Sequence, residues 1–397
     1  MTGTDGLAEI MRAYDTPAYV FDADAFRTRI RDVRKALGDG TGLCFSMKAN
    51  PFLAAVAADE GLLVETCSPG ELDICIACGI APRQILYSGV CKGEEDVRRA
   101  LEYGVGTFTA ESPRQLTLVD AEAESMGKVA DVLLRLAAGS QFGMTFDDLA
   151  ACVDSRDSMC GVSLVGIHYF VGTQRSHARE QRKDLSIVAE AVARLRDEHG
   201  WDPSRIEYGP GLPVPYFDGD DFSDTLAPAR ELAPALSSMS TGHALTVEMG
   251  RFLAAGCGCY VSRIVETKDG EGDPYAFVEG GINHVSYYGH MMGMKRPVIR
   301  NITAVIDGDA EGRDRGPWNL CGSLCTTSDV LARRLSLPLR VGDALSLENA
   351  GAYSVTEGIG LFLSRDLPKV IMIDRGKATL LRDAMPTSSI NMPGPRS

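Results

Sequence analysis

Short apolar runs alternate with amphipathic segments from the start of the chain to about residue 250. Eight of these runs have the length of buried strands, at 42–46, 62–66, 84–88, 106–108, 131–136, 162–168, 205–208 and 244–248. Most intervals between them carry a helical pattern of apolar positions. Eight strands that alternate with helices over about two hundred residues predict an α/β protein with a closed (β/α)8 TIM-like barrel, rather than an open doubly wound sheet.

The pattern changes after Arg251, where strand-like runs are separated by Gly- and Asp-containing turns. These runs lie at 259–267, 275–279, 301–306, 345–348 and 369–373, and 307–316 is expected to be a charged loop. We therefore predict a barrel domain over 22–250 and a β-rich barrel or sandwich over 251–385. An N-terminal strand within residues 1–21 is expected to join the second domain. The Pro-, Ser- and Asn-rich tail 386–397 is expected to be disordered.

Charge and composition narrow the classes of partner. The formal net charge of −14 favours solubility and argues against a surface for nucleic acid or for an anionic membrane. No uninterrupted apolar run approaches the length of a membrane span, and the N-terminus does not have the pattern of a secretion signal. We therefore expect a cytoplasmic protein. The six histidines form neither HxxxH nor HxH, so a metal site has little support.

The candidate chemistry follows the predicted barrel strands, because barrel enzymes collect catalytic groups at the carboxyl ends of their strands. Lys48 follows the first strand. A lone lysine is more often a surface residue, but at this place it is also a candidate for covalent bonding to a carbonyl compound. Gly209-Pro210-Gly211 and Gly250-Arg251 follow the last two strands, where barrels often bind phosphate. Together with Glu248 they suggest pyridoxal phosphate (PLP).

Six motifs follow one another along the chain. They are Phe45-Ser46-Met47-Lys48-Ala49-Asn50, Cys67-Ser68-Pro69-Gly70-Glu71-Leu72, Gly166-Ile167-His168-Tyr169-Phe170-Val171-Gly172-Thr173-Gln174, Glu248-Met249-Gly250-Arg251, Cys325-Thr326-Thr327-Ser328-Asp329 and Gly351-Ala352-Tyr353. In these motifs and in their order, the chain resembles the PLP-dependent decarboxylases of fold type III over residues 14 to 382. Within the diaminopimelate, ornithine and arginine decarboxylase group, its layout is most similar to that of diaminopimelate decarboxylases.

The resemblance implies roles for residues of the barrel. Lys48 would hold PLP as an internal aldimine, Glu65 would lie near that bond, and Glu248 would pair with the pyridine nitrogen. That pairing makes the ring an electron sink for the carbanion left when CO2 departs. Either His168 or Phe170 would stack on the ring. The residues implied around the phosphate are Thr173, Gly209, Gly211, Gly250, Arg251 and Tyr353.

The resemblance also implies roles in the second domain. Cys325 would reach across a homodimer interface into the partner's site and protonate the former α-carbon, so that two active sites are shared. Thr326, Asp329 and Tyr288 would face the substrate. The implied activity is α-decarboxylation of an amino acid.

Departures from the family pattern concern the substrate. Thr326 stands where an acidic residue usually reads a distal amino group, and an arginine usually found four residues before Tyr288 is missing. Phe170 replaces a histidine that usually packs on PLP, and an aromatic face can still stack. A neutral hydroxyl cannot balance a distal ammonium as a carboxylate does. We therefore expect either a diaminopimelate-like substrate or an altered amino acid of natural-product biosynthesis, such as glutamate tethered to an acyl carrier protein.

Two alternative functions remain open. Alanine racemases share the barrel and the lysine-bound PLP, but they place an arginine at the pyridine nitrogen, so Glu248 favours decarboxylation. The chain could instead be a non-catalytic, PLP-binding regulator of another decarboxylase. The presence of both Lys48 and Cys325 argues against that role.

Overall fold

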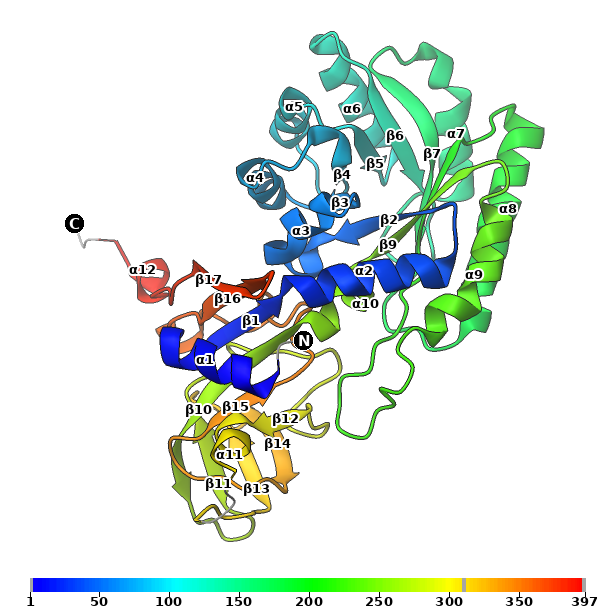
Figure 1. Ribbon diagram of the computed structural model, residues 1–397. Helices are drawn as coiled ribbons and strands as arrows, with labels where there is room; N and C mark the ends of the chain where they lie inside the picture. Colours follow the sequence, from blue (N-terminus) through cyan, green and yellow to red (C-terminus); the bar gives the residue numbers. More distant parts are fainter. Residues whose placement is uncertain (1–2, 309–311, 395–397) are drawn as a thin grey trace. The chain divides into compact units, whose positions relative to one another are not determined.

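The computed structural model describes residues 3–308 and 312–394, and the chain divides into two compact units (Figure 1). The barrel unit comprises Arg29–Val214 and Asp224–Leu253. The β-rich unit comprises the described residues of Met1–Thr28, Pro215–Ser223 and Ala254–Ser397. The division after Thr28 differs from the predicted boundary at residue 22, and it falls inside the helix α2 (Ala23–Leu37). The segment Pro215–Ser223, predicted within the barrel, belongs to the β-rich unit.

Eight parallel strands close into a barrel, in which β9 pairs with β2. They are β2 (Thr41–Ser46), β3 (Leu63–Thr66), β4 (Ile85–Tyr87), β5 (Thr107–Ala110), β6 (Ala130–Arg135), β7 (Val162–Phe170), β8 (Arg205–Gly209) and β9 (Ala244–Met249). Each overlaps one of the eight predicted runs. The predicted (β/α)8 barrel with a separate β-rich domain is thus confirmed. Parallel barrel strands are covered on both faces, which is why they read as continuous apolar runs.

Helices lie around these strands (Figure 1). They are α3 (Ala54–Asp59), α4 (Pro69–Ala77), α5 (Glu94–Tyr103), α6 (Pro113–Ser125), α7 (Phe146–Asp154), α8 (Ala178–His199) and α9 (Ala227–Met239), and the short α10 (Arg251–Ala254) follows β9. The sequence marks where two of these helices, α4 and α6, begin. Ser68 and Ser112 accept the backbone N–H of Glu71 and Gln115, and a proline takes the first helical position after each serine.

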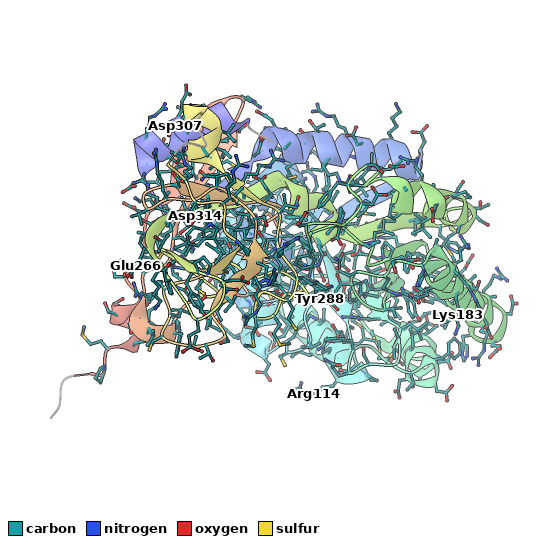
Figure 2. All side chains as sticks on the ribbon, turned by 90° about the horizontal axis from the view of Figure 1, so that it is seen from below. Arg114, Lys183, Glu266, Tyr288, Asp307 and Asp314 are labelled. Carbon is teal, nitrogen blue, oxygen red and sulfur yellow. The ribbon has the colours of Figure 1, made fainter. Side chains whose placement is uncertain are left out.

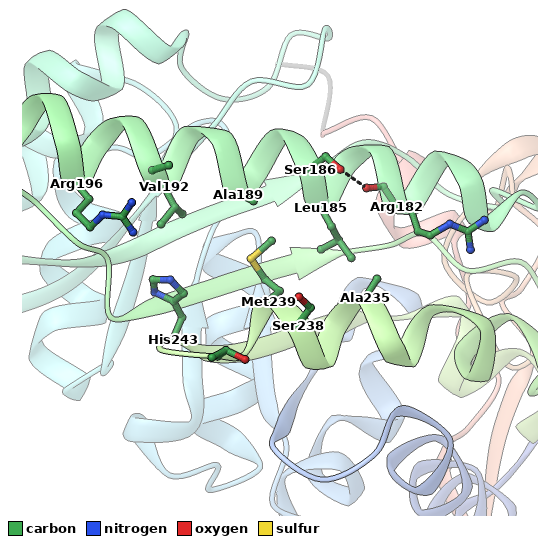
Figure 3. Close-up of a pocket in the computed structure, with 12 residues that line it drawn as sticks. Arg182, Leu185, Ser186, Ala189, Val192, Arg196, Ala235, Ser238, Met239 and His243 are labelled. Carbon is green, nitrogen blue, oxygen red and sulfur yellow. Dashed lines mark hydrogen bonds between the residues drawn. The ribbon is translucent and has the colours of Figure 1, made fainter.

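The helices α8 and α9 pack along each other and leave a groove between them (Figure 3). Leu185 and Val192 of α8 face Ala235 of α9 in this groove, with Arg182 and Arg196 at intervals along α8. None of the residues that line it was predicted to take part in chemistry. The groove belongs to the outer helical layer.

The β-rich unit is built on a nine-stranded mixed sheet. Its strands are β1 (Ala18–Asp22), β10 (Gly258–Lys268), β11 (Tyr275–Val278), β12 (Ile299–Asn301), β13 (Trp318–Cys321), β14 (Val330–Leu335), β15 (Ala344–Leu347), β16 (Lys369–Asp374) and β17 (Lys377–Arg382). The N-terminal strand β1 lies between β10, to which it is antiparallel, and β16, to which it is parallel. The helix α1 (Thr4–Tyr14) covers one part of this sheet through Leu7 and Ile10.

The prediction of a strand over residues 301–306 is wrong. The strand β12 ends at Asn301, and Ile302–Asp307 form the helix α11. The Asn301 side chain accepts the backbone N–H of Ala304 and so caps the helix. Ile302 is buried, whereas Val305 and Ile306 are 61% and 36% exposed, so the apolar run does not mark a buried strand. The helix α1 and the strands β13, β14 and β17 had no counterpart among the predicted elements.

Two predicted irregular segments are only partly described. Residues 309–311 of the charged loop and residues 395–397 of the tail lie outside the described residues. In the rest of the tail, Ser388–Asn391 form the short helix α12, and Asn391 donates to the carbonyl of Leu361. No helix in the described parts of the chain combines the length and the apolar character that crossing a membrane requires.

Candidate active site

Lys48 stands at the carboxyl end of the first barrel strand, in a 3-10 turn of Met47–Ala49. Its Nζ lies 2.6 Å from Oε2 of Glu65 and 3.5 Å from Oε1 of Glu248. The Cys67 thiol lies 3.6 Å from the same nitrogen. The lysine side chain is 38% exposed, while those of Glu65 and Glu248 are 4% and 5% exposed. The amine is therefore held by two buried acids and remains reachable from solvent.

Glu248, near the end of β9, is held by hydrogen bonds to both of its carboxylate oxygens. Ser46 Oγ donates to Oε1 at 2.6 Å, and His168 Nε2 lies 3.0 Å from Oε2, where it can donate. Burial by itself would raise the pKa of Glu248, but Lys48 and the hydrogen bonds from His168 and Ser46 hold the pKa well below its usual range. Glu248 is consequently an anion inside the barrel, ready to pair with a cationic group.

The predicted aromatic positions lie on β7. His168 is buried, and its Nδ1 contacts no donor or acceptor within the described part of the chain. Phe170, two residues further on the same strand face, packs its ring against Gly209 of β8, where a Cβ would overlap the ring. The ring of Phe170 and the imidazole of His168 thus line neighbouring levels of the barrel's carboxyl end.

The loops that follow β7, β8 and β9 approach one another closely. Gly211 has a φ of +62°, and a Cβ there would overlap the carbonyl oxygen of Gly172. A Cβ at Gly250 would lie 2.8 Å from the Cβ of Ala49. Arg251 Nε donates to Thr173 Oγ1 at 3.3 Å, which ties the loop after β9 to the loop after β7. Bare backbone and a guanidinium at one edge suit a phosphate group, whose oxygens accept several hydrogen bonds.

Besides the Cys67 thiol next to Lys48, the structure adds two residues to those predicted from the sequence. Ser46, directly before the turn that carries Lys48, is a donor to Glu248. Glu207 on β8 is 1% exposed and lies beside His168 and Glu248. One side-chain nitrogen or oxygen atom from each of the three residues lies within 4.8 Å of the other two atoms. The sequence does contain a signal for Glu207. It lies two positions before Gly209, and alternate residues of a strand share a face, so Glu207 is expected to point to the same side of the strand as Gly209. Its neighbours, however, come from other strands.

The remaining predicted residues belong to the β-rich unit. Cys325 is an exposed free thiol. Asp329, only 3% exposed, accepts the backbone N–H of Ile282 at 2.9 Å and that of Leu324 at 2.8 Å. It thereby holds the loop that carries Cys325. Thr326 Oγ1 lies 2.9 Å from the hydroxyl of Ser328 in this loop.

Two tyrosines of the β-rich unit complete the predicted set. Tyr288, which is labelled in Figure 2, has an exposed fraction of 49%. Tyr353 adopts a φ of +66°, and its carbonyl accepts the backbone N–H groups of Thr356 and Glu357 at 2.9 Å each. Positive φ is uncommon for a bulky residue, so the turn after Gly351 fixes this tyrosine in a defined place. The structure describes both side chains on their own unit, and their contacts with a cofactor or substrate stay predictions.

His284 begins the stretch in which the family's usual arginine is missing. Its Nε2 donates to the carbonyl of Asp366 at 2.8 Å, and Nδ1 accepts from the hydroxyl of Tyr260 at 2.8 Å. Burial, with a smaller contribution from the nearby Arg365, lowers the pKa of His284 to about 4. The ring is therefore a neutral part of the unit's interior and does not replace the missing charge.

Comparisons with known proteins agree with this arrangement. Residues 23–255, more than half of the chain, match the family model described as pyridoxal-dependent decarboxylase, pyridoxal binding domain. The chain is 27% identical over 399 residues to a diaminopimelate decarboxylase of Zymomonas mobilis, covering 95% of this chain and 92% of the relative. It is 26% identical over 400 residues to an L-glutamyl-[BtrI acyl-carrier protein] decarboxylase of Niallia circulans, covering 95% and 93%.

A solved structure shows the same fold. The diaminopimelate decarboxylase of Helicobacter pylori, complexed with L-lysine, superposes with a TM-score of 0.82 at 20% identity, over 97% of this chain and 98% of that one. The family match covers all eight barrel strands, including the strand ends that carry Lys48, His168 and Glu248. The chain therefore belongs to the pyridoxal-dependent decarboxylases.

Proposed function

We propose that this chain removes the α-carboxylate of an amino acid whose distal end carries no free charge. Membership of the family makes it a PLP-dependent amino-acid decarboxylase. The observation that carries the finer proposal is the absence of two charged side chains that usually bind the distal end of the substrate, an acid at position 326 and an arginine before Tyr288. Thr326 is neutral and bonded to Ser328, and His284 is neutral and bonded within its own unit. A buried distal charge without a counter-charge would cost several kcal/mol, by the order of magnitude of ion desolvation.

The barrel residues fit PLP in their charge and in the chemistry of their donors. Lys48 offers the amine that bonds the cofactor's carbonyl, and Glu248 offers the anion that pairs with its pyridine nitrogen. Gly209, Gly211 and Gly250 lie so close to neighbouring protein atoms that a Cβ would overlap them, and their bare backbone, together with Arg251, would hold the phosphate. When bound, the cofactor draws away the electron pair that remains on the α-carbon after CO2 departs.

The protein's own groups have separate tasks in this scheme. Glu65 accepts from Lys48 and keeps its amine at the strand end, and the partial exposure of Lys48 lets a substrate amine approach. Ser46 and His168 hold Glu248 ionised, so that a proton on the pyridine nitrogen stays there. Cys325 is an exposed thiol and, within a homodimer with shared sites, would supply the proton that the α-carbon takes up.

A glutamyl group tethered to an acyl carrier protein satisfies the proposal. For the α-carboxylate to be free, the link must occupy the side-chain carboxyl, and this removes the distal charge. The relative of Niallia circulans acts on such a substrate. A diaminopimelate-like substrate is the second candidate, because the relative of Zymomonas mobilis matches the chain with similar identity and coverage. This substrate would need a counter-charge from another position, because Thr326 is neutral.

One experiment separates the two candidates. The purified protein with PLP is incubated with carrier-bound L-glutamate, meso-diaminopimelate, lysine and ornithine, and the loss of CO2 is followed by mass spectrometry. We expect turnover of the carrier-bound substrate and little of the diamino acids. The matched variant Thr326→Asp should gain about tenfold in kcat/KM for a diamino acid, the effect of about 1.4 kcal/mol of charge pairing. Efficient use of free diaminopimelate by the unmodified protein would refute the finer proposal.

A further inference from the structure

Three side chains from neighbouring strands meet inside the barrel: His168 on β7, Glu207 on β8 and Glu248 on β9. If one side-chain nitrogen or oxygen atom is taken from each residue, the three atoms lie within 4.8 Å of one another. His168 and Glu207 are also direct partners in the register of β7 and β8. The cluster thus places a second carboxyl beside Glu248, and none of the contacts assigned to the cofactor or the substrate uses this carboxyl.

The two carboxyls differ in what stabilises a negative charge on them. Glu248 accepts hydrogen bonds from Ser46 and His168 and faces Lys48. Glu207 is 1% exposed, and no N–H or O–H group of the described residues donates to either of its oxygens. The thiol of Cys44 on β2 lies against it, and a thiol is only a weak donor.

The burial of Glu207 and the two nearby acids also favour its protonated form. Burial raises the pKa of Glu207 well above its usual range, and repulsion from Glu248 and Glu65 raises it further. Arg205, at the start of β8, opposes this shift but lies 3.6 Å from Asp131. Lys48 is already engaged by Glu65 and Glu248. Two carboxyls this close in a dry interior titrate as a pair, because ionisation of one opposes ionisation of the other.

We propose that Glu207 and Glu248 form a buried pair with one negative charge, in which Glu207 holds the proton and Glu248 the charge. Glu207 is then a positioning residue that acts on the cofactor through Glu248. An ionised Glu207 would raise the proton affinity of Glu248, which would then compete with the pyridine nitrogen for its proton. The proposal deepens the PLP-dependent function and rests on it, but the pair itself is a property of the cofactor-free protein and is tested there.

Infrared difference spectroscopy reads the proton directly. Cofactor-free protein is compared with Glu207→Gln at neutral pH, and the variant should lose the carbonyl-stretching band of a protonated carboxylic acid. The control Glu111→Gln removes a buried carboxyl whose Oε1 is 2.7 Å from Arg135, and it should leave that band in place. Loss of a carboxylate band instead, with the carboxylic-acid region unchanged, would overturn the proposal.

Stability against pH gives a second measurement, which needs neither cofactor nor substrate. A carboxyl whose pKa is raised in the folded state takes up a proton on folding, so its contribution to stability is lost as pH rises above the ordinary carboxyl range toward the raised value. Glutamine at position 207 has no such loss. The Tm of Glu207→Gln minus that of the unmodified protein should therefore increase from about pH 5 to about pH 8. A difference that stays constant or decreases over this range would contradict the proposal, whatever the substrate panel shows.

Discussion

The two units of the chain hold their chemical groups in different ways. In the barrel unit, Lys48, Glu65 and Glu248 come from the ends of separate strands, and both acids are nearly buried. In the β-rich unit, Cys325 is exposed on a loop, and Asp329 supports that loop through two backbone N–H groups. The difference indicates that the two units have separate roles. Rigid strands can set charges and pKa values, whereas a loop can vary in sequence and so adapt to different substrates.

Replacement of the barrel's amine should have the largest effect. Lys48→Ala removes the group assigned to covalent cofactor binding and leaves Glu65 and Glu248 without their shared cation. We expect activity to fall by on the order of 10³-fold or more, as when a covalent catalytic group is removed. Loss of the visible absorbance that borohydride abolishes in the unmodified protein would accompany it. An alanine variant with full activity would show that the chemistry is not centred on the barrel.

Glu248→Gln tests whether activity depends on the negative charge of Glu248 inside the barrel. The variant keeps the shape but cannot carry the anion, and activity should fall by about 10²-fold, the scale of a lost proton-holding group. The pKa of Glu248 is depressed in the folded state, so its contribution to stability is present above the ordinary carboxyl value and is lost as pH falls through the depressed one. The difference in the free energy of unfolding between the unmodified protein and Glu248→Gln, measured by denaturant titration, should consequently become smaller as the pH falls. A gap independent of pH would contradict the charge assignment.

Asp329→Asn probes the loop of the β-rich unit and should have the smallest of these effects on activity, about tenfold. An amide can accept from only one of the two backbone N–H groups, so the free energy of unfolding should fall by about 1–3 kcal/mol. Faster labelling of the Cys325 thiol would report the loosened loop. The control Asp383→Asn changes an exposed acid and should alter neither quantity. Equal labelling rates in both variants would show that Asp329 does not support this loop.

The pattern of apolar residues predicts part of the β-rich unit wrongly, because these residues are not all buried. The run 301–306 looked like a strand, yet the Asn301 cap and the exposure of Val305 mark a helix. The barrel strands are less ambiguous, because both of their faces are covered and most of their residues are buried. The groups around Lys48 were predicted from their places after these strands and from their resemblance to a known family.

The sequence by itself determined the eight barrel strands, the place of Lys48 at the end of the first and the acid at the end of the last, because continuous apolar runs and the residues that follow them are local features. Only the tertiary structure decided that Ser46, His168 and Glu207 surround Glu248. These residues are separated by up to about two hundred positions and come together because the barrel closes. The charge on Glu248 and the proton proposed on Glu207 depend on distances and burial, which closure alone creates.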